Sequence, residues 1–204
     1  MAKLKLNLPN TLTLLRICFI PFIMVCVLIP AENRVLLDIF SAVLFLLAAL
    51  TDLFDGMIAR RNSMVTNFGK FLDPIADKLL VCASLVALIG SEKFSYIRLA
   101  LVICTAIILL REFSVTSIRL IAAKHDGSVI AASRLGKLKT VVSDVGIIAI
   151  LLEPVIFQGE EGIMANIRNM HVLSYVMLVL MTVLTVISGL NYIIKYFSYI
   201  DPEK

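Results

Sequence analysis

Residues 52–77 read DLFDGMIARRNSMVTNFGKFLDPIAD, and this stretch contains four aspartates: Asp52, Asp55, Asp73 and Asp77. Apolar sequence flanks the stretch on both sides. Crossing the hydrocarbon core of a membrane takes about 20 apolar residues in a helix. We therefore interpret the stretch as the junction of two membrane-crossing helices, which a short hairpin from Arg61 to Phe68 connects as antiparallel neighbours.

The composition of the whole chain indicates a membrane protein. Its 204 residues are 60% hydrophobic and only 17% charged, whereas soluble domains are usually about 45 to 50% apolar. This excludes a water-soluble globule, a disordered chain and a fibrous protein. The net charge of +4 is small and dispersed, so we expect contact with membrane lipids and no nucleic-acid partner. At this length we expect a single domain over residues 1–204.

Six segments are predicted to cross the bilayer as helices. They are Thr11 to Ile29, Val35 to about Ala59, Pro74 to Ile89, Ile97 to about Ala123, Leu135 to Leu152, and Val172 to Ile194. Polar and turn-forming residues separate these segments. The sequence therefore predicts an all-α integral membrane protein with six transmembrane helices and both termini on one side.

The distribution of lysine and arginine predicts the orientation. Cations concentrate on the side of the N-terminus, and the opposite side holds only Arg34, Lys93, Arg98 and Arg168. Because cytoplasmic loops carry the excess of positive charge, we expect both termini in the cytoplasm. The lack of an organelle-targeting extension and the six-helix plan favour a bacterial cytoplasmic membrane.

The four aspartates are candidates for a metal site. A carboxylate at membrane depth costs several kcal/mol unless it is paired, binds metal or faces water. Helical spacing places Asp52 and Asp55 about 60° apart on one face, and Asp73 and Asp77 about 40° apart on the next helix. All four can then converge near the cytoplasmic interface, and an all-oxygen ligand set selects Mg²⁺ or Mn²⁺. Small residues on the same face, Gly56 and Ala59, leave room for a bulky ligand.

Two other classes of protein could contain such a cluster. A cation transporter or channel could be lined by the same four acids, but transporters tend to place ion sites near the membrane midplane, at broken helices. Here the acids occupy cytoplasmic helix ends. A membrane scaffold without chemistry would leave the acidic cluster unexplained. Both alternatives are therefore less favoured than a catalytic site.

The spacing D-x-x-D-G-x-x-A-R, eight residues, then G-x-x-x-D-x-x-x-D, resembles the motif of the CDP-alcohol phosphotransferases. The resemblance extends to three further groups of residues. These are Leu8 to Thr13 with Arg16 and Pro21, Arg111-Glu112-Phe113 with Arg119, and Gly136 to Thr140. Together they are similar to the phosphatidylglycerophosphate synthase branch of that family.

The resemblance implies six transmembrane helices, often in a homodimer, around a polar cavity open to the cytoplasm. It also implies two Mg²⁺ or Mn²⁺ ions, with Asp52, Asp55 and Asp73 as ligands and Asp77 as both ligand and catalytic base. The residues that it assigns to the CDP-linked lipid are Asn10 through Thr13, Gly56, Ala59, Arg60 and Thr66.

The implied reaction transfers the phosphatidyl group of CDP-diacylglycerol to glycerol 3-phosphate and releases CMP. An acceptor with nearly two negative charges requires cations in the cavity. The candidates are Arg111, Arg119, Lys137 and Lys139. In the alternative interpretation, the arginines pair with Glu112 or the aspartates, and the lysines bind lipid headgroups. A different acceptor, such as phosphatidylglycerol in cardiolipin synthesis, remains the alternative within the family.

Overall fold

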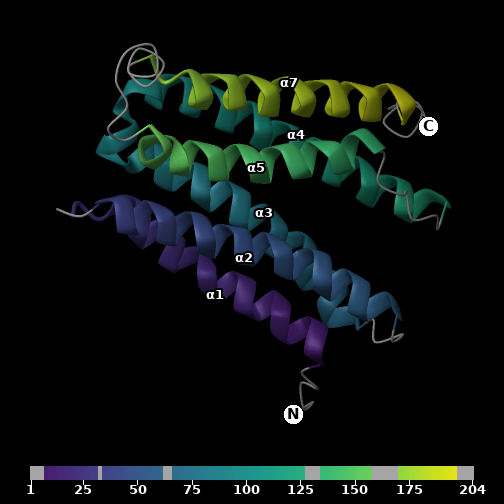
Figure 1. Cartoon of the computed structure of the whole chain (residues 1–204). Helices are drawn as coiled ribbons and strands as arrows, with labels where there is room; N and C mark the ends of the chain where they lie inside the picture. Colours follow the sequence, from purple (N-terminus) through teal and green to yellow (C-terminus); the bar gives the residue numbers. More distant parts are fainter. Residues whose placement is uncertain (1–6, 32–33, 62–65, 127–133, 158–169, 197–204) are drawn as a thin grey trace.

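The computed structural model describes residues 7–31, 34–61, 66–126, 134–157 and 170–196, and their regular structure is helical (Figure 1). The elements in these ranges are α1 (Leu8–Leu28), α2 (Arg34–Arg61), α3 (Asn67–Gly90), the 3₁₀ helix η1 (Glu92–Ile97), α4 (Arg98–Asp126), α5 (Arg134–Ile156) and α7 (Val172–Lys195). The prediction of an all-α protein is confirmed. Most helix ends lie within four residues of the predicted bounds.

The start of α3 differs most from its predicted bound. The helix begins at Asn67 and not at Pro74, because the Thr66 side chain caps it by accepting a hydrogen bond from the Gly69 backbone N–H at 3.0 Å. Pro74 therefore lies inside the helix. As a result, Asp73 lies in the second turn of α3, and helical backbone precedes it.

The helices form two groups that pack against each other. In the first group α1 packs on α2 and α3, and in the second α7 packs on α4 and α5. The groups meet where α2 contacts α5 and α3 contacts α4, as Figure 1 shows. Fully buried apolar side chains from both groups fill this contact and include Phe45, Leu85, Leu88, Leu101, Ile108, Ile147 and Ile150.

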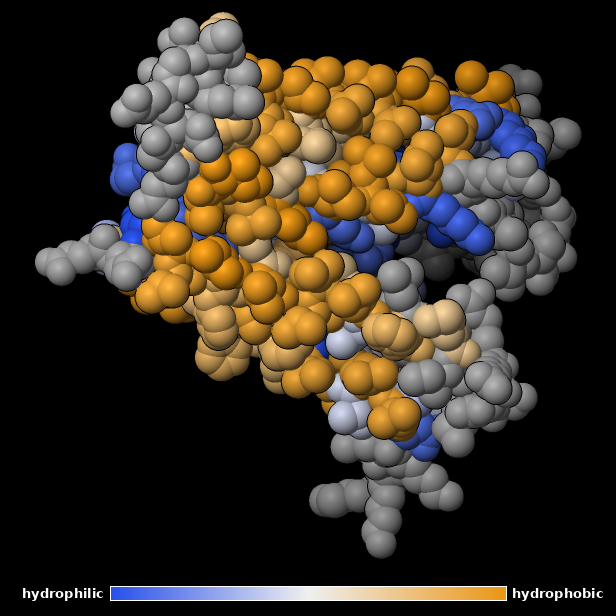
Figure 2. Space-filling model, viewed as in Figure 1, coloured by the Kyte–Doolittle hydropathy of each residue, from blue (hydrophilic) through white to orange (hydrophobic). Residues whose placement is uncertain are grey.

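Large apolar side chains cover the outside of the bundle. Leu99 and Ile194 are 75% and 76% exposed, and Phe22 is 62% exposed. In Figure 2 hydrophobic residues spread over most of the visible face, while hydrophilic residues gather toward the helix ends and in a recess between the two helix groups. Such a surface is unfavourable in water and suits the acyl chains of lipids. The chain is therefore a membrane protein.

Four segments of the described residues are long and apolar enough to span a membrane: Leu8–Leu28, Arg34–Asp52, Glu92–Arg119 and Val172–Lys195. The helices α3 and α5 have 24 and 23 residues but do not meet the same criterion. Every 18-residue stretch of α3 contains Asp73, Asp77 and Lys78. The charges that lower the hydropathy of α3 are those that line the cavity described below.

A buried carboxylate fixes the far end of the second helix group. Glu153 on α5 is 1% exposed and accepts hydrogen bonds from the backbone N–H of Leu173 at 3.1 Å and of Ser174 at 3.4 Å. These N–H groups belong to the first turn of α7, where the helix dipole favours negative charge. Glu153 thereby holds α7 against α5 at the end of the bundle away from the acidic stretch.

Candidate functional site

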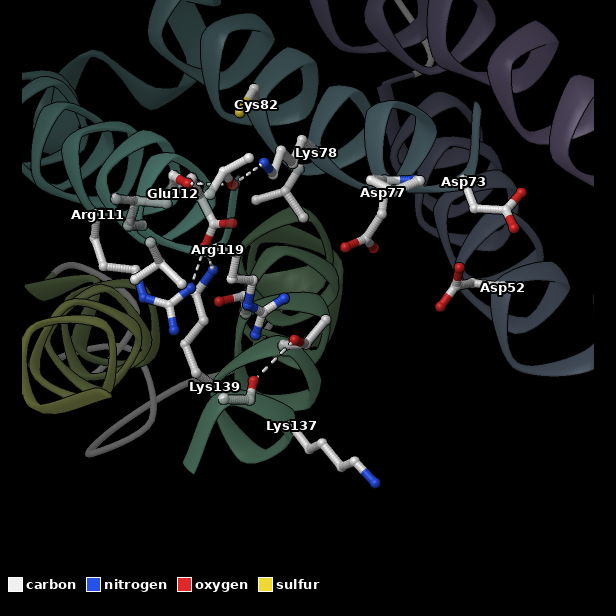
Figure 3. A pocket seen from close by; sticks show the side chains of 18 residues that line it. Asp52, Asp73, Asp77, Lys78, Cys82, Arg111, Glu112, Arg119, Lys137 and Lys139 are labelled. Atoms are coloured by element: carbon white, nitrogen blue, oxygen red, sulfur yellow. Dashed lines mark hydrogen bonds and ion pairs between the residues drawn. The ribbon is translucent and has the colours of Figure 1, made fainter. Parts of the chain in front are cut away.

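A cavity of about 570 Å³ lies between α2, α3, α4 and α5, where the two helix groups meet. Figure 3 shows the side chains that line it. The charged members of this lining are Asp52, Asp73, Asp77, Lys78, Arg111, Glu112, Arg119, Lys137 and Lys139. These nine charged side chains therefore face a cavity between the helices rather than lipid.

Three of the four predicted metal ligands line this cavity. Asp52 comes from α2, and Asp73 and Asp77 come from successive turns of α3. In Figure 3 the three carboxyl groups lie on the same side of the cavity. The side chain of Asp55 falls outside the described part of the chain. The side chains of Ala59 and Arg60 also fall outside the described part, and these residues belong to α2 together with Gly56, the third predicted lipid-binding residue of this helix.

Arg16 holds Asp52 in place. The Arg16 side chain is fully buried on α1, and its Nη1 donates to Asp52 Oδ1 at 2.7 Å while its Nε donates to Thr51 Oγ1 at 3.4 Å. A buried guanidinium requires an anionic partner. Arg16 was not among the site residues predicted from the sequence, although a cation within an apolar segment already indicates a nearby carboxylate.

The start of α1 meets the start of α3 beside Asp73. Thr13 Oγ1 donates to Asp73 Oδ1 at 2.8 Å, and Thr66 Oγ1 donates to Asn10 Oδ1 at 3.0 Å. A Cβ at Gly69 would lie 2.8 Å from Asn10 Oδ1, so this approach requires glycine. The structure therefore brings together the predicted lipid-binding residues Asn10, Thr13 and Thr66 next to one predicted metal ligand.

Asp77 differs from the other two aspartates in its contacts. Within the described residues, no side chain donates a hydrogen bond to its carboxylate or forms an ion pair with it, whereas Asp52 and Asp73 each have a donor within 2.8 Å. A carboxylate that lines a cavity without a donor can bind a ligand or take up a proton.

The opposite wall of the cavity is cationic. The four predicted phosphate-binding residues all line it: Arg111 and Arg119 from α4, and Lys137 and Lys139 from α5. Lys78 from α3 also lines the cavity, and it was not among the site residues predicted from the sequence. Lys78 follows Asp77 directly in a mostly apolar segment, and a charge in such a segment indicates a functional site.

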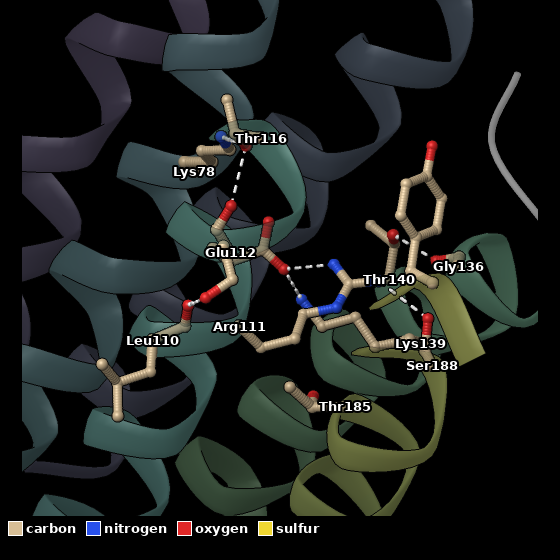
Figure 4. A network of polar contacts seen from close by, with 12 residues as sticks. Lys78, Leu110, Arg111, Glu112, Thr116, Gly136, Lys139, Thr140, Thr185 and Ser188 are labelled. Atoms are coloured by element: carbon tan, nitrogen blue, oxygen red, sulfur yellow. Dashed lines mark hydrogen bonds and ion pairs between the residues drawn. The ribbon is translucent and has the colours of Figure 1, made fainter. Parts of the chain in front are cut away.

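Glu112 joins two of these cations, as Figure 4 shows. Its Oε1 accepts from Arg111 Nη1 at 2.8 Å and from Lys139 Nζ at 2.5 Å. Arg111 Nη2 also donates to Ser188 Oγ on α7 at 2.7 Å. The pairing of Arg111 with Glu112, one of the two interpretations of this arginine, is therefore present, and Glu112 connects α4 to α5 through Lys139.

Replacing Glu112 by glutamine is expected to destabilise the protein by about 3 kcal/mol, because two mostly buried cations lose their shared carboxylate. The side chains of Arg111 and Lys139 are only 12% and 7% exposed. Thermal unfolding in detergent micelles measures this effect. The matched control is Glu92→Gln, since Glu92 is 85% exposed in its pair with Arg98 and should contribute little. Equal unfolding temperatures for Glu112→Gln and wild type would contradict the prediction.

The described acids suit a hard metal ion by their chemistry. Asp52, Asp73 and Asp77 offer only carboxylate oxygens, which Mg²⁺ and Mn²⁺ prefer. Among the side chains that the structure describes, no three His, Cys, Asp or Glu residues are close enough to form a metal site by themselves. The fourth predicted ligand, Asp55, is not among those side chains.

The fold and this cavity agree with the sequence comparisons. The profile of the CDP-alcohol phosphatidyltransferase family matches residues 6–190. The chain belongs to this family, and it is a membrane enzyme that transfers phosphatidyl groups. A cation transporter and a scaffold without chemistry are thereby set aside.

Several relatives, among them the following three, carry the name CDP-diacylglycerol--glycerol-3-phosphate 3-phosphatidyltransferase. The one from Bacillus subtilis (strain 168) is 42% identical over 161 residues, which are 74% of this chain and 80% of the relative. The one from Rickettsia bellii is 38% identical over 93% of this chain and 95% of the relative. The one from Salmonella choleraesuis is 35% identical over 78% of this chain and 85% of the relative.

Proposed function

We propose that this protein transfers the phosphatidyl group of CDP-diacylglycerol to the 1-hydroxyl of glycerol 3-phosphate. The products are phosphatidylglycerophosphate, which stays in the bilayer, and CMP. The observation that carries the proposal is one cavity with carboxylates on one wall and cations on the other, in a chain similar to enzymes of that name. Each wall fits one of the two substrates.

The acidic wall fits the diphosphate of the lipid donor. Asp52, Asp73 and Asp77, with Asp55, would hold two divalent ions there. Bound ions of this kind neutralise the diphosphate and stabilise the negative charge that grows on the leaving CMP. Arg16 and Thr13 keep Asp52 and Asp73 in fixed positions through their hydrogen bonds.

The remaining contacts at this wall fit the nucleotide. The start of α1 and the Thr66 cap of α3 contribute hydroxyl and amide groups next to Asp73. Such groups bind a cytidine or its ribose by hydrogen bonds. We assign Asn10, Thr13 and Thr66 to this role, together with Gly56, Ala59 and Arg60 of α2.

Asp77 is the proposed base. Its carboxylate accepts the proton of the acceptor hydroxyl as the oxygen attacks the lipid-bearing phosphorus, and the bond from that phosphorus to CMP breaks. A base within hydrogen-bond reach must have an accepting oxygen available, and Asp77 has no competing donor among the described residues. Water has to be kept from the same phosphorus, because it would hydrolyse the donor.

The cationic wall fits the phosphate of the acceptor. Arg111, Arg119, Lys137 and Lys139 lie on α4 and α5, across the cavity from the aspartates (Figure 3). A small acceptor with a phosphate at one end and a hydroxyl at the other spans the two walls. An acceptor without this charge would leave the cations of the cavity without a ligand.

We also propose that the six α-helices of the described residues all cross the membrane. The lengths of α3 and α5 suffice for a crossing, and charges that face a cavity do not contact lipid. The start of α1, the end of α7, the end of α2 and the start of α3 lie at one end of the bundle (Figure 1). We place this end and the mouth of the cavity in the cytoplasm of a bacterial cell, with the enzyme as a homodimer in the cytoplasmic membrane.

Release of CMP from CDP-diacylglycerol by the purified protein tests the proposal. Glycerol 3-phosphate should support turnover, while glycerol should be poorer by at least about 10²-fold, because it makes no charge-assisted hydrogen bonds with the cationic wall. Phosphatidylglycerol should support none. Faster CMP release with phosphatidylglycerol than with glycerol 3-phosphate would indicate cardiolipin synthesis and overturn the proposal.

A further inference from the structure

The cations of the cavity differ in the partners that the structure gives them. Arg111 and Lys139 share the Glu112 carboxylate, which neutralises part of their charge. In the described residues, Lys78 and Arg119 bond to neutral hydroxyl groups instead: Lys78 Nζ donates to Thr116 Oγ1, and Arg119 Nε donates to Tyr192 Oη at 2.9 Å. A dianionic ligand is attracted more strongly to a cation that no carboxylate already neutralises.

Lys78 keeps hydrogen-bonding capacity in its observed position. The Thr116 hydroxyl donates its own proton to the Glu112 backbone carbonyl at 2.7 Å, so it acts toward Lys78 as an acceptor. Figure 4 shows this chain from Lys78 through Thr116 to Glu112. A lysine ammonium carries three N–H donors, and one contact of this kind uses one of them. Thr116 thus holds the Lys78 side chain at the cavity wall and leaves donors for a ligand.

The position of Lys78 along α3 relates it to the proposed base. Successive residues of an α-helix point about 100° apart, so Asp77 and Lys78 face neighbouring sectors of the space beside α3. Both side chains line the same cavity. An acceptor that carries a phosphate and a hydroxyl on one three-carbon chain can therefore contact Lys78 with the first and Asp77 with the second.

We propose that Lys78 is a further residue that binds the acceptor's phosphate, together with Arg119. This inference rests on the proposed function of the cavity. Lys78 contributes a charge that orients the acceptor with its hydroxyl toward Asp77, while Glu112 neutralises part of the charge of Arg111 and Lys139. The ligand chemistry is a phosphomonoester on a short polyol.

Kinetics of Lys78→Gln, with CDP-diacylglycerol and glycerol 3-phosphate varied separately, test this role. We expect KM for glycerol 3-phosphate to rise about 10- to 100-fold, because a hydrogen bond to a charged group is lost. We expect KM for CDP-diacylglycerol to stay within about twofold. Lys78→Arg keeps the charge and should restore most of the affinity. The matched control is Lys195→Gln, which removes a lysine that does not line the cavity and should change neither constant.

Each outcome separates this inference from the proposed function. If the wild type does not release CMP with glycerol 3-phosphate, the proposed function fails. If the wild type is active and Lys78→Gln changes KM for both substrates equally or for neither, only the role of Lys78 is wrong. Should Lys78→Gln not fold, Lys78→Met keeps the aliphatic length of the side chain and has the same expected result.

Discussion

Asp77→Asn is expected to lower kcat by about 10² to 10⁴-fold while much of the binding of CDP-diacylglycerol remains. Asparagine has nearly the same shape as aspartate but cannot accept a proton at neutral pH. Asp52 and Asp73 keep their own hydrogen bonds to Arg16 and Thr13 in this variant. The loss should therefore appear in turnover more than in KM for the lipid donor.

The control for this prediction is Asp38→Asn. Asp38 is 5% exposed and pairs with Lys93 of η1, and it precedes Asp52 by 14 residues on α2, which is about 21 Å along the helix. Its loss should lower the unfolding temperature without lowering kcat of the folded enzyme. Measured rates are normalised to folded protein by size-exclusion chromatography in detergent. Wild-type kcat in Asp77→Asn would remove Asp77 from the chemistry.

Removal of divalent metal is expected to abolish CMP release, and Mg²⁺ or Mn²⁺ should restore it. The reason is electrostatic, because a diphosphate cannot approach the carboxylates of Asp52, Asp73 and Asp77 closely unless cations lie between them. The measurement is the rate of CMP release after treatment with EDTA and after titration of each metal back into the assay.

EDTA already saturated with Mg²⁺ is the control, since it contains the same chelator without withdrawing the ion. Binding of the donor, followed by the unfolding temperature with and without CDP-diacylglycerol, should also weaken when metal is removed. Full activity in excess EDTA would show that the carboxylates act without a metal. The acidic wall would then need another explanation.

The helices of this protein could be predicted from its sequence, because long apolar segments separated by polar residues leave few other structures in a bilayer. The start of α3 could not be predicted from hydropathy. The Thr66 side chain caps the helix locally, so the helical backbone begins before the apolar run does. The motif spacing also predicted that aspartates from two helices meet. Asp52, Asp73 and Asp77 line one cavity, as expected.

The partners of the charged groups were much less predictable. Arg16 and Asp52 are 36 residues apart, and the Thr13 to Asp73 contact spans 60 residues. Periodicity gives the direction of a side chain around its own helix but not the identity of the neighbour that it meets. Glu112 could have been an exposed acid, and only the arrangement of α4 and α5, which both pack on α7, makes it the shared partner of two cations.

The sequence by itself determined that the chain lies in a membrane and that it is helical, because both properties follow from hydropathy along the chain. The spacing of the aspartate motif carries the resemblance to the CDP-alcohol phosphotransferases, and the expected reaction comes from that resemblance. The tertiary structure decided which cations are neutralised by Glu112, which aspartate lacks a donor among the described residues, and that Lys78 faces the same cavity. Such facts depend on distances between helices, and those distances are set only when the helices pack together.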